Sequence, residues 1–127
     1  MNKTIVLTGL VLGALAVILG AFGAHGLKKI LSTVELATFE TGVKYQMYHA
    51  LFLLVLGSLP LVGDEVKTRV FYLILLGIIF FSFSIYGLAT NALTGFDFKK
   101  IGWITPIGGL LLISGWAYLF FAVLTKK

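Results

Sequence analysis

The chain has 127 residues, of which 59% are hydrophobic and 12% are charged, whereas a soluble domain carries about 25% charged residues. This composition excludes an ordinary soluble protein and predicts one integral membrane domain over residues 1–127, too short to add a catalytic domain. The absence of cysteine excludes disulfides and thiolate chemistry. The net charge of +5 comes from basic residues that mostly flank apolar runs, so we expect contact with lipid headgroups and not with nucleic acid.

The first apolar run, residues 4–25, has about the 20 residues that a helix needs to cross the hydrocarbon core of a bilayer. Its basic start also resembles a secretory signal. The run is longer than a signal core, so we expect a retained membrane helix. Small residues recur along one face of it, which favours close helix packing in lipid. They are Gly9, Gly13, Ala16, Gly20 and Ala24.

A second helix is predicted from Ser32, which forms a capping-box pattern with Glu35. No strong helix breaker follows until the end of the next apolar run. A helix of this length exceeds the thickness of the hydrocarbon core. We therefore predict an amphipathic segment over residues 33–44 that is an interfacial helix, or a protruding or bent extension with Gly42 as the candidate position of the bend. A second span is predicted over residues 45–62.

Two further apolar runs complete the predicted fold. Residues 68–90 form a third span with acidic residues just before it, as suits a helix N-terminus. Thr105 and Pro106 are typical of an N-cap followed by proline in the first turn, and they open a fourth span over residues 106–124. The predicted packing residues of this span are Gly108, Gly109 and Gly115. The fold class is an all-α bundle of four transmembrane helices.

Four spans would place both termini on one side of the membrane and gather the neutral polar residues towards the other side. We predict that these residues line a polar and aromatic pocket for a lipid headgroup, an amphiphile or a small solute. The candidates are His25, Tyr45, Gln46, His49, Ser82, Ser84, Tyr86 and Thr105. The alternative is that they only tie helices together or anchor them at the interface. Basic residues divide evenly between the two sides, so neither orientation is favoured strongly.

Four motifs in these runs resemble the YgdD/YwdK-like family of small bacterial integral membrane proteins, which has eukaryotic relatives. The motifs are residues 20–27 (GAFGAHGL), Thr41-Gly42 with Tyr45-Gln46 and His49, Ser82 with Ser84 and Tyr86, and residues 105–109 (TPIGG) with Gly115-Trp116. Phe83 departs from the family pattern, which usually has glycine there. The resemblance covers nearly the whole chain and implies a four-helix membrane protein. It implies no activity, because the family is of unknown function.

We expect no enzymatic activity, no catalytic residue, no metal and no cofactor. The predicted spans contain no paired carboxylates, Ser84 with His49 lacks a nucleophile motif, and His25 with His49 lacks the spacing of a metal or haem site. The favoured interpretation is a lipid-interacting or structural accessory module that contacts membrane lipids and self-associates as a homo-oligomer through its glycine faces. The alternative is an oligomeric channel or transporter for a small solute. The lack of an acidic residue within the spans disfavours proton-coupled export.

Overall fold

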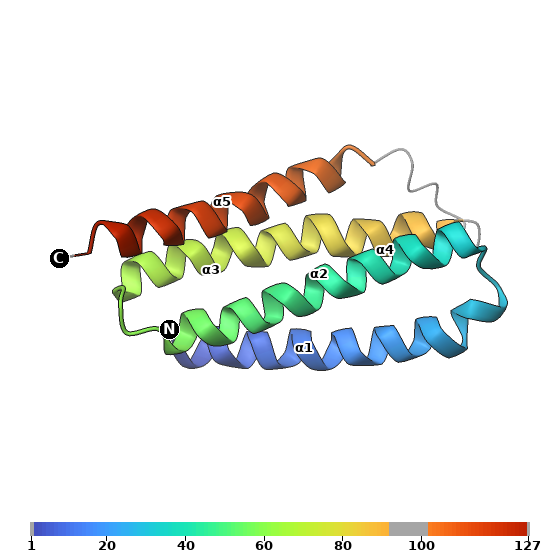
Figure 1. Ribbon diagram of the computed structural model, residues 1–127, viewed down its shortest axis with the longest axis horizontal. Helices are drawn as coiled ribbons and strands as arrows, with labels where there is room; N and C mark the ends of the chain where they lie inside the picture. Colours follow the sequence, from blue (N-terminus) through green and yellow to red (C-terminus); the bar gives the residue numbers. More distant parts are fainter. Residues whose placement is uncertain (1, 92–101, 127) are drawn as a thin grey trace.

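The structure is a computed structural model that describes residues 2–91 and 102–126, and within these residues it contains helices and no strand. The helices are α1 (Asn2–His25), η1 (Leu27–Lys29), α2 (Thr33–Ser58), α3 (Asp64–Ile78), η2 (Ile79–Phe83), α4 (Ser84–Ala89) and α5 (Ile104–Leu124). The single π-helical turn η2 joins α3 and α4 into one rod. This rod and the helices α1, α2 and α5 lie side by side, and the two ends of the chain lie at the same end of the bundle (Figure 1).

The described residues include three helical stretches that are long and apolar enough to cross a membrane, namely Asn2–Lys29, Asp64–Ala89 and Ile104–Leu124. They coincide with the first, third and fourth apolar runs of the sequence. Helix α2 is not among them, because Lys44, Gln46 and His49 interrupt its apolar part. The second of the four predicted spans therefore stays a prediction.

Helix α2 begins at the capping box that the sequence predicts. The Ser32 hydroxyl accepts a hydrogen bond from the Glu35 N–H at 3.1 Å, and the Glu35 carboxylate accepts one from the Ser32 N–H at 2.9 Å. The helix then continues without a break through Gly42, where the sequence suggested a bend. Gly42 allows close packing of α2 and α4, since a Cβ there would lie 2.6 Å from the Tyr86 ring.

The segment over residues 33–44, for which the sequence predicts an interfacial, protruding or bent extension, packs against its neighbours in the bundle; its position relative to the membrane stays a prediction. Phe39 is buried, and its ring centroid lies 5.1 Å from that of Tyr86 in α4. It also packs in a small apolar cluster with Leu27, Leu31 and Ala89. An apolar face this long finds partners on α1 and α4, so the first half of α2 lies within the bundle.

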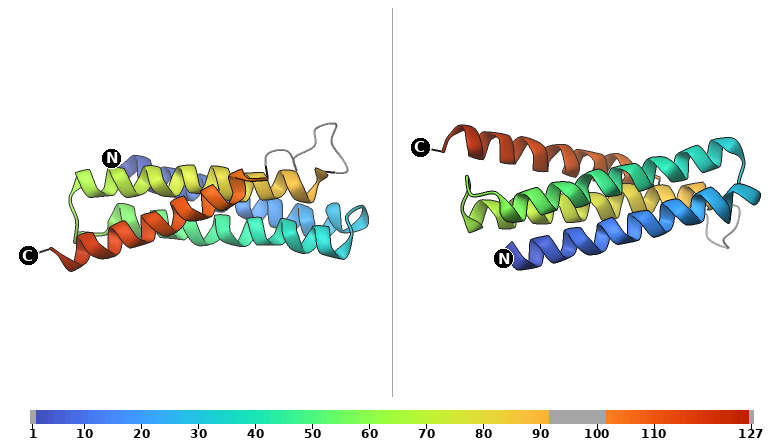
Figure 2. Two further views of the ribbon diagram at one scale, coloured as in Figure 1. Left: turned by 90° about the horizontal axis from the view of Figure 1, so that it is seen from above. Right: turned by 60° about the horizontal axis from the view of Figure 1, so that its bottom comes forward.

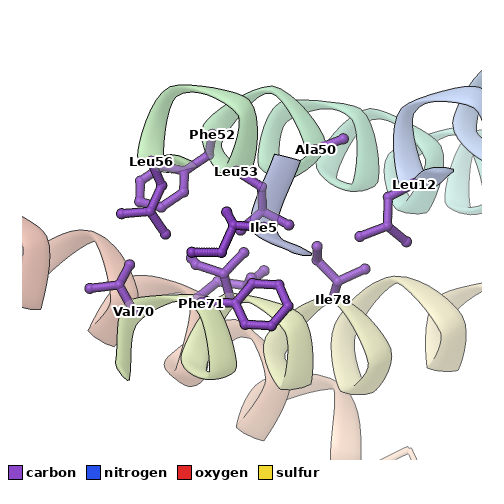
Figure 3. Packing of buried hydrophobic residues seen from close by; sticks show 11 residues of the cluster. Ile5, Leu12, Ala50, Phe52, Leu53, Leu56, Val70, Phe71 and Ile78 are labelled. Carbon is purple, nitrogen blue, oxygen red and sulfur yellow. The ribbon is translucent and has the colours of Figure 1, made fainter. Parts of the chain in front are cut away.

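The main core lies towards the end of the bundle that holds the two chain termini. Ile5 of α1 and Leu53 of α2 are fully buried there against Ile74 and Ile78 of α3 (Figure 3). Leu112 of α5 joins the same cluster. The outward faces are apolar as well, as expected where lipid and not water surrounds the bundle.

The predicted packing glycines divide into two groups. A Cβ on Gly9 would lie 2.9 Å from the Ala50 carbonyl oxygen, one on Gly115 would lie 2.6 Å from Ile74, and one on Gly108 would overlap the backbone of η2. These glycines allow close helix contact. Added Cβ atoms on the others would make only ordinary contacts, at 3.5 Å or more. This second group consists of Gly13, Gly20 and Gly109.

Helix α5 packs mainly along α3 and η2, on the opposite side of the bundle from α1. It runs at an angle to the other helices (Figure 2). This angle leaves space between α5 and α2, and the candidate groove described below lies in that space.

Candidate functional site

Gln46 forms the most buried polar link of the bundle. Gln46 belongs to α2, and its side chain is fully buried inside the bundle, where an unpaired amide would be costly. The Nε2 group donates to the backbone carbonyl of Leu12 in α1 at 2.8 Å, and Oε1 accepts from the Tyr86 hydroxyl of α4 at 2.6 Å. A single side chain thus ties three helices together.

His49 forms a second link, between α2 and α5. Its Nδ1 lies 2.7 Å from the backbone carbonyl oxygen of Tyr45, and its Nε2 lies 2.9 Å from the indole Nε1 of Trp116. The indole can only donate, so Nε2 accepts and Nδ1 carries the proton of a neutral imidazole. The Phe52 ring packs against Trp116 in a tilted arrangement, with ring centroids 4.5 Å apart and an interplanar angle of 59°.

The two candidate serines, Ser82 and Ser84, differ in their hydrogen bonding. The Ser84 and Thr105 hydroxyls are 2.6 Å apart and join α4 to α5. Ser84 also donates towards the carbonyl oxygens of Phe80 and Phe81 in the π-helical turn. Ser82 is fully buried, and its hydroxyl has no hydrogen-bond partner among the described residues. It is therefore the exception to the rule that buried polar groups are paired.

The structure distributes the candidate residues over separate interhelix links and does not bring them all into one pocket. His25 is exposed at the end of α1 and takes part in none of the links described above. Tyr45 is partly exposed, with its ring against Phe81. His49, expected near one membrane face, lies beside Trp116 in the middle part of α5. The physical reason is that each polar group inside an apolar bundle bonds to the nearest available helix.

A groove of about 650 Å³ lies between α2 and α5. Its walls are apolar and aromatic, and among the described residues that line it the polar side-chain groups are the Tyr48 hydroxyl and the Trp116 indole N–H. The groove follows α5 from Trp116 to Leu124, and Val55 lies on the facing wall. Beyond Trp116, a smaller cavity of about 290 Å³ continues between Tyr45 and Gly109. The Trp116 ring, held by His49, separates the two spaces.

A third cavity, of about 420 Å³, opens between α3 and α5 beside Val66 and Ala122. The Tyr118 hydroxyl at this cavity accepts a hydrogen bond from Nη1 of Arg69 at 2.8 Å. Arg69 also donates from Nη2 to the Glu65 carboxylate at 2.5 Å. Arg69 is thus hydrogen-bonded to Tyr118, one of the residues that line this cavity.

The sequence interpretation did not select Trp116, Tyr118 or Arg69 as site residues. Trp116 carried a usable signal, because it lies well inside an apolar run and its indole N–H needs a partner when buried. The sequence carried a weaker signal for the contacts of Arg69. Its ion pair with Glu65 follows from their spacing on one helix, but its bond to Tyr118 depends on how α3 and α5 pack.

A family model described as "Protein of unknown function (DUF423)" matches residues 19–109. A UPF0382 membrane protein of Staphylococcus haemolyticus is 41% identical over 114 residues, which are 87% of this chain and 89% of that protein. The UPF0382 membrane protein YwdK of Bacillus subtilis is 38% identical over 122 residues, covering 94% of this chain and 95% of YwdK. A Haemophilus influenzae relative is 38% identical over 126 residues, covering 99% and 97%. No solved structure gives a significant match.

Proposed function

The chain belongs to the DUF423 family of proteins of unknown function. From the groove between α2 and α5, we propose that it is a non-enzymatic membrane module that holds a lipid acyl chain there. The similarity to YwdK confirms the family expected from the sequence motifs. The chain is an integral membrane protein of a bacterial cell membrane, as its relatives are named. The bilayer therefore surrounds the groove and supplies the occupant.

The dimensions of the groove support an acyl chain as the occupant. From Trp116 to Leu124, α5 rises ~12 Å at ~1.5 Å per residue. One leaflet contributes about half of a hydrocarbon core of ~30 Å. The groove thus matches the depth of a chain that enters from one surface and stops near the middle of the bilayer, at the Trp116 ring.

The proposal includes four membrane crossings, with α2 as the second. Its polar side chains are the main obstacle to a crossing, because unpaired polar groups are costly in hydrocarbon. Gln46 and His49 face the bundle interior and bond to α1, α4 and α5. Burial of Leu53 and Leu56 against the neighbouring helices further supports α2 as a full member of the bundle.

The hydrogen bonds of the candidate residues support a role without catalysis. Both ring nitrogens of His49 are engaged, so the imidazole is not free to act as a base. The Ser84 hydroxyl bonds to Thr105 and to backbone carbonyls, and it has no imidazole partner among the described residues. Of these side chains, His49 supports the groove through its bond to Trp116, and Ser84 joins α4 to the start of α5.

A matched pair of substitutions tests the groove. Val55 lines it and is 59% exposed, whereas Val17 is 62% exposed on α1 and lines none of the three cavities described above. The probe is phosphatidylcholine with a photoreactive group near the end of one acyl chain, incorporated into vesicles with the protein. Crosslinks should map to α2 and α5 beside the groove, fall in Val55→Trp and persist in Val17→Trp. Equal crosslinking in the two variants would contradict the proposal.

A further inference from the structure

The groove and the smaller cavity lie one after the other along the same two helices. Helix α5 lines the groove from Trp116 to Leu124 and the smaller cavity from Gly109 to Trp116. Helices α2 and α5 both run towards the end of the bundle that holds the chain termini (Figure 1). Helix α2 therefore lines the two spaces in the same order, with Tyr45 at the smaller cavity and Val55 at the groove. Trp116 lines both spaces and lies where they meet.

Two side chains of α2 hold the Trp116 ring at this junction. The indole N–H donates to Nε2 of His49 at 2.9 Å, and the two rings meet edge-on at an interplanar angle of 84°. The Phe52 ring packs against the indole, with centroids 4.5 Å apart. The Trp116 side chain is 52% exposed, so the ring lies in the open seam between the helices and not in the core. An acyl chain that extends along the groove therefore meets this ring.

The space beyond the ring is chemically suited to more of the same chain. The smaller cavity occupies about 290 Å³, and Phe81, Leu112 and Ile113 give it apolar walls. It continues along α5 for ~10 Å, from Trp116 back to Gly109. Hydrocarbon fits such a lining, so the indole is what divides one long apolar path into two parts.

We propose that Trp116 determines the length of the acyl chain that the groove accepts. A chain that ends at the ring lies in the groove along its full length of ~12 Å. The end of a longer chain has to leave the groove at Trp116 and lie among the surrounding lipids. This inference rests on the proposed function, and it specifies the ligand as a short acyl chain.

The test uses two phosphatidylcholine probes in vesicles, with a photoreactive group at the end of either a decanoyl or an octadecanoyl chain. Crosslinks that Val55→Trp removes are those that depend on the groove. In the wild type, the decanoyl probe should give such crosslinks beside Trp116, and the octadecanoyl probe should give fewer. In Trp116→Ala, the longer probe should gain groove-dependent crosslinks that lie up to ~10 Å farther along α5, at Leu112 and Ile113.

Two further variants separate the length limit from a general disturbance of the bundle. Trp103→Ala removes an indole that is 63% exposed and lines none of the three cavities, and it should keep the wild-type pattern. Ile113 lines the smaller cavity and is 65% exposed, so a larger side chain can extend there without overpacking the core. Adding Ile113→Trp to Trp116→Ala should restore the preference for the decanoyl probe, a gain that misfolding does not produce.

The outcomes distinguish this inference from the proposed function. Groove-dependent crosslinks of the octadecanoyl probe at Leu112 or Ile113 in the wild type would overturn the length limit, and this result requires no substitution at Trp116. An unchanged crosslinking pattern in Trp116→Ala would overturn it as well. Either result would leave the groove proposal standing. If neither probe gave a crosslink that depends on Val55, the groove proposal itself would fail.

Discussion

Trp116 donates its indole N–H to Nε2 of His49 over 2.9 Å, and this bond joins α5 to α2 across the space that separates them. The Phe52 ring adds an aromatic contact at the same point. The larger groove lies on one side of Trp116 and the smaller cavity on the other. This polar contact therefore sets both the separation of the two helices and the inner end of the proposed acyl-chain site.

Trp116→Phe should destabilise the protein, because the ring is largely kept while His49 loses its donor. Interhelix hydrogen bonds in membranes are worth about 0.6 kcal/mol on average and up to about 1.7 kcal/mol. Unfolding in mixed micelles by a denaturing detergent measures the difference. Trp103→Phe is the control, since Trp103 is 63% exposed at the start of α5. Equal stability of the two variants would show that the bond contributes nothing.

Gln46 and Tyr86 should behave as an energetically coupled pair, because the Tyr86 hydroxyl donates to Gln46 Oε1 at 2.6 Å. Tyr86→Phe, Gln46→Leu and the double variant form a cycle, and we expect a coupling free energy of about 0.6 kcal/mol or more. Tyr72→Phe, at an exposed tyrosine of α3, should show no coupling to Gln46→Leu. Strict additivity for Gln46 and Tyr86 would argue against the bond.

Neighbouring glycines of α5 should differ sharply in their tolerance of alanine. A Cβ on Gly108 would lie 2.6 Å from the backbone carbon of Phe80, so α5 and η2 would have to separate. A Cβ on Gly109 would meet only the Phe81 ring, at 3.5 Å. Gly108→Ala should therefore cost about 1–3 kcal/mol, as overpacking of a close contact does. Gly109→Ala should be close to neutral in the same detergent titration, and the reverse order would contradict the packing described here.

Ser82→Ala should leave the protein as stable as the wild type or more stable. A buried group without a hydrogen bond carries a desolvation penalty of about 1–3 kcal/mol, and alanine removes it. Ser114→Ala is a suitable control, because the Ser114 hydroxyl bonds to the Leu110 carbonyl. A clear loss of stability in Ser82→Ala alone would mean that the hydroxyl has a partner in the membrane, such as a bound water.

Local patterns allowed much of the fold to be predicted. The capping box of Ser32 and Glu35 involves residues three positions apart, so the sequence contains all of its chemistry. The apolar runs likewise indicated where α1 and α5 lie. The uninterrupted helix from Ser32 through Gly42 was predicted as well, from the lack of a helix breaker. The close contact of Tyr86 with Gly42 was not predictable in this way, because it depends on how α2 and α4 pack.

The links between polar residues depend on tertiary packing to a greater degree. Gln46 and Tyr86 are 40 positions apart, and His49 and Trp116 are 67 apart. Segment order could place such residues at similar heights in the bundle, but it could not pair them. The same limit explains why one shared pocket was expected where the structure has separate links and a largely apolar groove.

The groove proposal requires α2 to cross the membrane, and the chain allows a direct test because it contains no cysteine. Cysteines introduced together at Lys29, before α2, and at Gly63, after it, report on the two ends of that helix. Intact cells are treated with a membrane-impermeant maleimide, and mass spectrometry counts the labels on each chain. Permeabilised cells, where both thiols react, provide the control.

If α2 crosses, a chain in either orientation exposes one of these two thiols outside the cell, so each chain should carry a single label. If α2 does not cross, both thiols lie on the same side of the membrane. Chains with two labels, or with none until the cells are permeabilised, would contradict the four-crossing bundle on which the proposed acyl-chain groove rests.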